Sequence, residues 1–148
     1  MTLRALIVED DGAMGQAILD ATRVGGLDAG RLCETGEEAL ELLKNGPYEA
    51  VVLDTTLPGM SGFEVIKCIR NKIGNPHDVK QIPILILSED ASIESKVRAL
   101  ELGANDYMTK PFHRDELVAR LKAFHRSRIN WRVEALTEMR PALGRRVG

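Results

Sequence analysis

Short apolar runs alternate with longer amphipathic segments along most of the chain. Leu3–Val8, Ala50–Leu53 and Ile82–Leu87 are almost continuously apolar, which is typical of parallel strands buried on both faces. Segments 28–34 and 106–109 are shorter or diluted by polar residues, and we predict that they are also strands. The pattern therefore predicts five strands.

A segment with apolar residues at helical spacing follows each predicted strand. Asp11 is expected to lie at the start of the first helix as its cap, and Gly25 and Gly103 are expected to end the first and fourth helices. Strands that alternate with helices predict a doubly wound α/β fold, with a parallel sheet and helices on both faces. The helix positions that we expect to face the core are Met14, Ala17, Ile18, Ala21, Ala39, Leu42, Leu43, Phe63, Val65, Ile66, Ile69, Ile93, Val97, Ala99, Leu100, Leu117, Val118, Leu121 and Phe124.

Composition restricts the class of protein further. The chain has 148 residues, of which 44% are apolar and 28% charged, as in one ordinary globular domain. Its net charge of −2 gives no overall attraction to nucleic acid or to an anionic membrane. No apolar run is long enough to span a bilayer, and Cys33 and Cys68 match neither a disulfide framework nor a zinc motif. We therefore predict a cytoplasmic protein that contacts neither membrane nor nucleic acid directly.

Chemically active side chains directly follow the predicted strands. Because the carboxyl ends of parallel strands meet at one edge of the sheet, Glu9, Asp10, Asp54, Ser88 and Lys110 are expected to form one site. Crowded carboxylates require a compensating cation, of which the lysine supplies one. Mg²⁺ would supply the rest, since it prefers oxygen ligands and these loops contain no histidine or cysteine that would favour zinc or iron.

These residue types are suited to phosphoryl transfer. An aspartate such as Asp54 can act as a nucleophile and form an aspartyl phosphate. The transferred group spreads negative charge over three oxygens, which Mg²⁺, the Lys110 ammonium and the Ser88 hydroxyl would each stabilise.

The motifs around these residues resemble those of response-regulator receiver domains, and of the OmpR/PhoB group in particular. The resemblance covers residues 3 to about 126, and it implies a flavodoxin-like (CheY-like) sheet of five strands in the order 2-1-3-4-5. The motifs are Ile7-Val8-Glu9-Asp10-Asp11, Val52-Leu53-Asp54-Thr55-Thr56-Leu57-Pro58-Gly59-Met60-Ser61-Gly62, Leu85-Ile86-Leu87-Ser88 and Tyr107-Met108-Thr109-Lys110-Pro111-Phe112.

The resemblance implies a role for each residue of the site. Asp54 would accept phosphate from a histidine kinase or a phosphotransfer protein, while Ser88 and Lys110 would hold the phosphoryl group. Tyr107 would be the switch aromatic, whose ring moves into the space that Ser88 leaves when it turns toward the phosphoryl group. The peptide bond from Lys110 to Pro111 would be cis. The implied metal ligands are Asp10, Asp54, the backbone carbonyl of Thr56, and Glu9 through water.

The resemblance also implies symmetric dimers through the fourth helix, the fifth strand and the fifth helix. As an alternative to facing the core, some of the apolar residues of these helices would form the centre of that interface, namely Ile93, Val97, Leu100 and Val118. Three complementary charge pairs lie at the matching positions, and they would set register rather than affinity. The expected pairs are Lys96 with Glu116, Glu101 with Lys122, and Asp106 with Arg120.

We predict a receiver domain over residues 1–125 and a basic helical extension or tail over 126–148. The second segment has six arginines and two glutamates, with apolar residues at Ile129, Val133, Leu136 and Met139. It is too short for the DNA-binding domain usual in the OmpR/PhoB group. We interpret it either as a docking segment for a downstream protein or as a solvated tail.

The predicted function is a phosphorylation-dependent signalling switch that controls dimerisation or partner binding. Such a domain catalyses only its own phosphorylation and dephosphorylation, so it is not an enzyme in the usual sense. The alternative is a degenerate receiver that acts as an interaction module without phosphate. Two other classes of protein fit the sequence less well. A haloacid-dehalogenase-type phosphatase would need a second aspartate where Thr56 stands. A flavodoxin-like electron carrier would bind the phosphate of a flavin after the first strand, where the acidic residues Glu9 and Asp10 would repel it.

Overall fold

The computed structural model describes residues 3–71 and 81–139, and side chains as far as residue 126 apart from Ala29. Five parallel strands form one sheet in the predicted order, β2-β1-β3-β4-β5. Strands and helices alternate along the chain as β1 (Arg4–Val8), α1 (Gly12–Val24), β2 (Asp28–Cys33), α2 (Gly36–Asn45), β3 (Ala50–Leu53), α3 (Gly62–Asn71), β4 (Ile84–Ser88), α4 (Ile93–Leu102), β5 (Asp106–Thr109) and α5 (Arg114–Met139).

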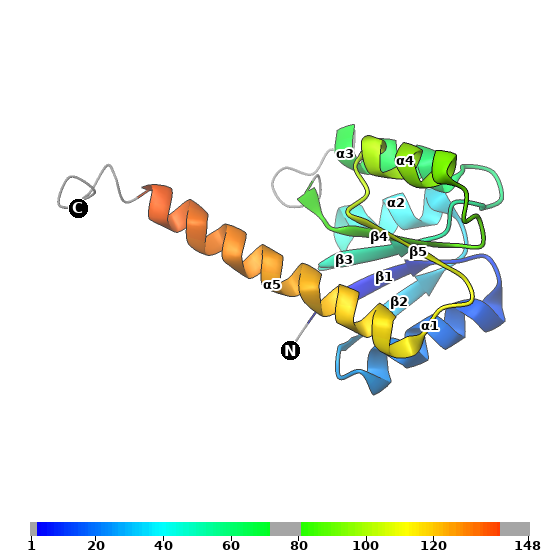
Figure 1. The fold of residues 1–148 in the computed structure, drawn as a ribbon, viewed down its shortest axis with the longest axis horizontal. Helices are drawn as coiled ribbons and strands as arrows, with labels where there is room; N and C mark the ends of the chain where they lie inside the picture. The colour runs from blue at the N-terminus through cyan, green and yellow to red at the C-terminus, as the bar shows by residue number, and fades with distance from the viewer. Residues whose placement is uncertain (1–2, 72–80, 140–148) are drawn as a thin grey trace.

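Helices cover both faces of the sheet (Figure 1). Successive side chains of β1 point to opposite faces: Leu6 and Val8 pack into the cluster beneath α2, α3 and α4, whereas Ala5 and Ile7 pack against α1 and α5. Because both faces are buried, each central strand needs apolar residues at every position. This requirement explains the continuous apolar runs and confirms the predicted fold class.

The prediction for the fourth helix is wrong for three of the four residues that it places in the core. Ile93, Val97 and Leu100 were expected in the core, but they are 69%, 46% and 48% exposed, and only Ala99 is fully buried. The small alanine faces the sheet, and the three larger residues lie on the outward side of α4. Ala17, also expected in the core, is exposed on α1.

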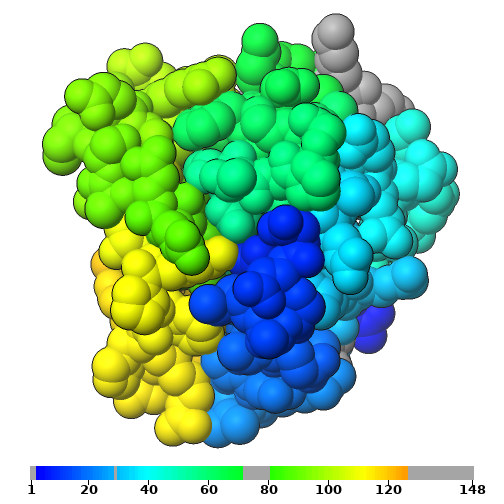
Figure 2. Space-filling view, turned by 90° about the vertical axis from the view of Figure 1, so that its right-hand side faces the viewer, coloured from blue at the N-terminus to red at the C-terminus, as the bar shows by residue number. Residues whose placement is uncertain are grey.

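Strand register brings the ends of the central strands to one edge of the sheet. Val8 pairs with Leu53, so Glu9 and Asp54 leave the sheet side by side, and the Asp54 amide donates to the Val8 carbonyl at 3.2 Å. On β4 and β5, Ser88 pairs with Thr109. Figure 2 faces this edge and shows the loops that follow β1 (blue), β3 (green) and β5 (yellow) in contact.

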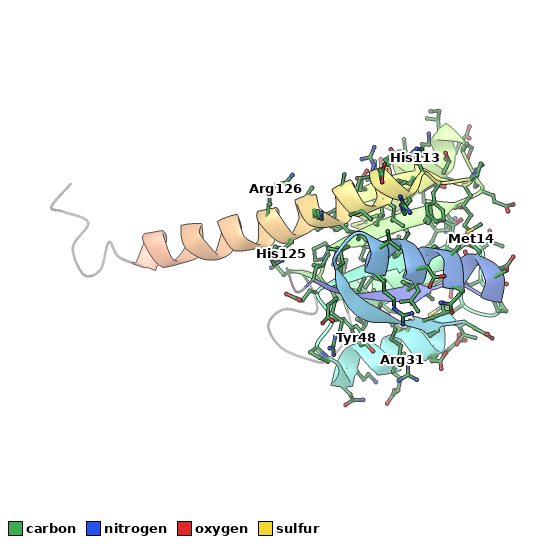
Figure 3. All side chains as sticks on the ribbon, turned by 90° about the horizontal axis from the view of Figure 1, so that it is seen from below. Met14, Arg31, Tyr48, His113, His125 and Arg126 are labelled. Atoms are coloured by element: carbon green, nitrogen blue, oxygen red, sulfur yellow. The ribbon has the colours of Figure 1, made fainter. Side chains whose placement is uncertain are left out.

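The last helix has a packed part and a projecting part. Leu117, Leu121 and Phe124 are buried beside α1, as the apolar pattern predicts. Figure 3 labels His125 and Arg126 near the point where α5 leaves the body of the domain, and the helix continues to Met139. The predicted apolar stripe of the extension falls among side chains outside the described part. Within the described residues, no helix combines the length and apolar character needed to cross a membrane.

Candidate functional site

An ammonium group joins two carboxylates at the edge where β1, β3 and β5 end. Lys110 Nζ donates hydrogen bonds to Glu9 Oε1 and, at 3.1 Å, to Asp54 Oδ2. All three side chains are less than one-tenth exposed, whereas Asp10 is exposed. A buried charge is tolerated only when it is paired, and this pairing brings together groups separated by up to 101 residues in the chain.

The carboxylates form a donor set that fits a hard divalent cation. Oxygen atoms of Glu9, Asp10 and Asp54 lie within 4.8 Å of one another. They open onto a hollow of about 220 Å³ that has five carboxylates and a single ammonium, so a cation would reduce the excess negative charge. Mg²⁺ takes one or two carboxylates together with water and phosphate, which these residues can supply. The hollow is lined by Glu9, Asp10, Asp11, Met14, Asp54, Thr56, Glu89 and Lys110.

Backbone groups orient the two central carboxylates. The Asp11 amide donates to Glu9 Oε2 and the Thr56 amide to Asp54 Oδ1, both at 3.2 Å. Asp11 itself accepts from two amides of the first turn of α1, which confirms its predicted role as the helix cap. The loop after β3 then folds back so closely that a Cβ on Gly62 would lie 2.1 Å from the Asp54 carbonyl oxygen. Only glycine fits there, which explains why α3 begins with this residue.

Burial and pairing shift the pKa values of the central pair. Burial raises the pKa of Glu9 above its ordinary value of 4.5, and this effect outweighs the opposing hydrogen bonds from Lys110 and Asp11. Burial alone would lower the pKa of Lys110, but its hydrogen bonds to Glu9 and Asp54 outweigh burial and raise it. At neutral pH the lysine is therefore a fixed positive charge.

The raised pKa of Glu9 predicts a pH dependence of stability in the absence of divalent cations. The folded chain binds the Glu9 proton more tightly than the unfolded chain, so this residue's contribution falls as pH rises from 4.5 through its folded pKa. Glu9→Gln cannot ionise and is expected to remove that decline. Urea unfolding in EDTA at several pH values measures the effect, with the exposed Glu64→Gln as control. Equal pH slopes for wild type and Glu9→Gln would contradict the assignment.

Ser88 and Tyr107, the two predicted switch residues, both bond to Asp90. Ser88 is 1% exposed, and its Oγ accepts from the Asp90 amide at 3.1 Å. The Tyr107 hydroxyl donates to the Asp90 carbonyl at 2.5 Å. Ser88 also has a buried partner in Thr55, at 2.7 Å between the hydroxyl oxygens, which sequence reasoning missed. The predicted cis bond between Lys110 and Pro111 is present.

The six residues of the predicted dimer interface lie on α4, β5 and α5, next to the exposed apolar residues of α4. We call this set the output surface. Within one chain, Arg120 bonds to Asp106 at 2.6 Å and to Glu116 at 2.9 Å, so the arginine has two acidic partners without a second copy. The output surface comprises Lys96, Glu101, Asp106, Glu116, Arg120 and Lys122 together with Ile93, Val97 and Leu100.

The fold and this strand-end site define a class of signalling domain. The family described as "Response regulator receiver domain" matches residues 5–122, and the chain belongs to it. Among curated proteins, it is 44% identical over 125 residues to the cell cycle response regulator CtrA of Brucella ovis, an OmpR/PhoB-type response regulator. That match covers 84% of this chain and 50% of CtrA, so the chain spans about half the length of the curated relatives it matches.

Solved receiver structures agree with the fold. The receiver domain of the Francisella response regulator 1452 has a TM-score of 0.76 at 30% identity, over 84% of this chain and 98% of that one. The chemotaxis response regulator CheY4 of Vibrio cholerae has a TM-score of 0.74 at 26% identity, over 84% of this chain and 99% of that one. These similarities confirm the CheY-like receiver fold predicted from the motifs.

Proposed function

We propose that the chain is a phosphorylation-dependent switch that takes up a phosphoryl group on Asp54 and changes its output surface in response. The observation that carries this proposal is the bond from Lys110 to both Glu9 and Asp54, at the same sheet edge as the buried Ser88. The site thus offers a carboxylate nucleophile beside a fixed cation, as phosphoryl transfer requires.

The reaction is a transfer from a phosphohistidine of a kinase or phosphotransfer protein. A carboxylate oxygen of Asp54 attacks the phosphorus, the bond from phosphorus to the imidazole nitrogen breaks, and the released imidazole takes up a proton. Lys110 holds one phosphoryl oxygen and Ser88 turns to donate to another. Glu9, Asp10, Asp54 and the Thr56 carbonyl would hold Mg²⁺, which supplies charge neutralisation at the phosphoryl group.

The signal passes from Ser88 to the output surface through Asp90 and Tyr107. Asp90 bonds to both switch residues, and its carboxylate accepts from the Ser92 amide at 2.9 Å and from Ser95 Oγ at 2.5 Å, in and just before the first turn of α4. A turn of Ser88 therefore perturbs the start of α4 and the tyrosine together. Exposed Ile93, Val97 and Leu100 are the apolar surface on which this change acts.

Acetyl phosphate and Mg²⁺ test the proposal without a cognate kinase. Intact-protein mass spectrometry is expected to detect a single added phosphate when both are present and none when EDTA replaces Mg²⁺. Absence of the added mass from folded protein, across donors and divalent cations, would favour the alternative of an interaction module that works without phosphate.

Reversing one charge of the output surface is expected to weaken phosphate-stimulated dimers. Glu116→Lys places like charges against Lys96 of a second copy and beside Arg120 of its own chain, and adding Lys96→Glu is expected to restore part of the association. Light scattering with acetyl phosphate measures the dimer fraction, with Glu64→Lys at an exposed position of α3 as control. A double variant that stays as weak as Glu116→Lys would indicate that these residues do not pair across copies.

We also infer a cytoplasmic location and a downstream protein partner. Cys33 and Cys68 are both free thiols, as suits a reducing compartment. The projecting part of α5, which extends away from the body of the domain in Figure 1, gives such a partner a helix to bind. Deleting residues 126–148 is expected to leave phosphorylation of Asp54 unchanged.

A further inference from the structure

Thr55 lies directly behind the proposed phosphate acceptor and is bonded to the switch residue. Thr55 follows Asp54 in the chain, but its side chain points into the protein, and the residue is only 5% exposed. Thr55 Oγ1 and Ser88 Oγ are 2.7 Å apart, which joins the ends of β3 and β4 through a buried hydroxyl pair. The proposed phosphoryl chemistry assigns no role to this threonine.

The hydroxyl pair sets which way Ser88 points. Ser88 Oγ accepts from the Asp90 amide, is paired with Thr55 Oγ1 and also interacts with the Tyr107 hydroxyl, so the buried oxygen is surrounded by protein partners. Ser88 has one hydroxyl proton and one side-chain rotation. A rotation that brings it to a phosphoryl oxygen on Asp54 must break the bond with Thr55.

We propose that Thr55 is a positioning residue whose hydroxyl latches Ser88 in the resting arrangement, so that the phosphoryl group on Asp54 has to displace the latch before the output surface changes. This inference rests on the proposed function. The latch and the phosphoryl group compete for the same hydroxyl, and the strength of the latch sets the fraction of protein that responds.

Replacing the threonine by valine removes the latch while nearly keeping the side-chain shape. In Thr55→Val the buried Ser88 hydroxyl loses its bond with Thr55 in the resting state only, because in the activated state it bonds to the phosphoryl group instead. The resting state is therefore weakened selectively. A phosphoryl mimic that binds the activated state is expected to bind roughly five- to tenfold more tightly, which corresponds to the loss of one ordinary hydrogen bond.

Fluorine NMR of protein labelled with 3-fluorotyrosine gives the affinity and the state of the switch in one titration. The chain has two tyrosines: Tyr107 reports on the switch, and Tyr48, labelled in Figure 3 near the end of α2, serves as an internal control. Beryllium fluoride with Mg²⁺ is the probe, titrated into wild type, Thr55→Val and Thr55→Ser. The valine variant is expected to bind more tightly, and the serine variant, which keeps a hydroxyl, is expected to behave like wild type.

The same titration in a Ser88→Ala background separates a latch from a general packing effect. With the serine hydroxyl gone, Thr55→Val is expected to have no further effect on affinity, since the two changes remove the same bond. Should Thr55→Val fail to fold, as judged by its melting curve, Thr55→Ala carries the same test. Two results would overturn the latch while leaving the proposed function intact. One is a wild-type affinity for beryllium fluoride in Thr55→Val or Thr55→Ala. The other is a higher affinity that Thr55→Val still produces in the Ser88→Ala background. Folded wild type that does not bind the probe would overturn both.

Discussion

Asp54→Asn is expected to abolish phosphate uptake from acetyl phosphate. The amide has the shape of the carboxylate but lacks the negative charge that makes the oxygen a nucleophile. Its single oxygen can still accept from the Thr56 amide in the place of Oδ1, while Lys110 keeps its hydrogen bond to Glu9. The fold should therefore survive a change that removes the reaction. Intact-protein mass spectrometry after incubation with acetyl phosphate and Mg²⁺ measures the result.

A matched substitution separates loss of the nucleophile from loss of any one acidic charge. Asp20→Asn lies on the exposed side of α1 and changes the net charge equally, so it should be labelled like wild type. Label that persists at the wild-type rate in Asp54→Asn would mean that another side chain is the acceptor.

Lys110→Ala is expected to have the second large effect, on both stability and signalling. Removing the ammonium leaves Glu9 and Asp54 buried without their cation, which lowers the free energy of unfolding by about 3–5 kcal/mol in EDTA. Mg²⁺ binding should persist, because the three carboxylates remain. Lys110, however, directly follows β5 and is the residue that would connect this strand to the phosphoryl group. Without it, phosphorylation should no longer promote dimers.

Urea unfolding and light scattering with acetyl phosphate measure the two effects of Lys110→Ala separately. Lys67→Ala, on the exposed side of α3, serves as the control for loss of a lysine. A Lys110→Ala protein that unfolds and dimerises as wild type does would show that the ammonium contributes neither to the site nor to the switch.

The fold was predictable because burial on two faces leaves a strong signal in sequence. Runs such as Ile82–Leu87, which contains most of β4, have few alternatives to a central parallel strand, and the strand order followed from the family's motifs. The orientation of α4 was not predictable in this way. Ile93, Val97 and Leu100 define an apolar face at helical spacing, but spacing does not tell whether that face covers the chain's own sheet or a surface kept for another molecule.

The candidate site was largely predictable because the carboxyl ends of parallel strands must meet. That rule placed Glu9, Asp54 and Lys110 together without any knowledge of distances. It did not reveal Thr55, because a residue just beyond a strand leaves the alternating pattern and the direction of its side chain depends on the following loop. Likewise, Arg120 carries complementary charge to both Asp106 and Glu116, and only coordinates tell which acidic residue it meets within one chain.

Chemical identification of the phosphorylated residue distinguishes Asp54 from every other acceptor in the chain. Borohydride reduces an aspartyl phosphate to homoserine, so wild-type protein treated with acetyl phosphate and Mg²⁺ can be reduced, digested and sequenced by mass spectrometry. Phosphorylation of Asp54 gives homoserine at position 54 and leaves aspartate at positions 10, 11 and 90. Homoserine at another position, or a borohydride-resistant phosphate on a serine or histidine, would contradict it.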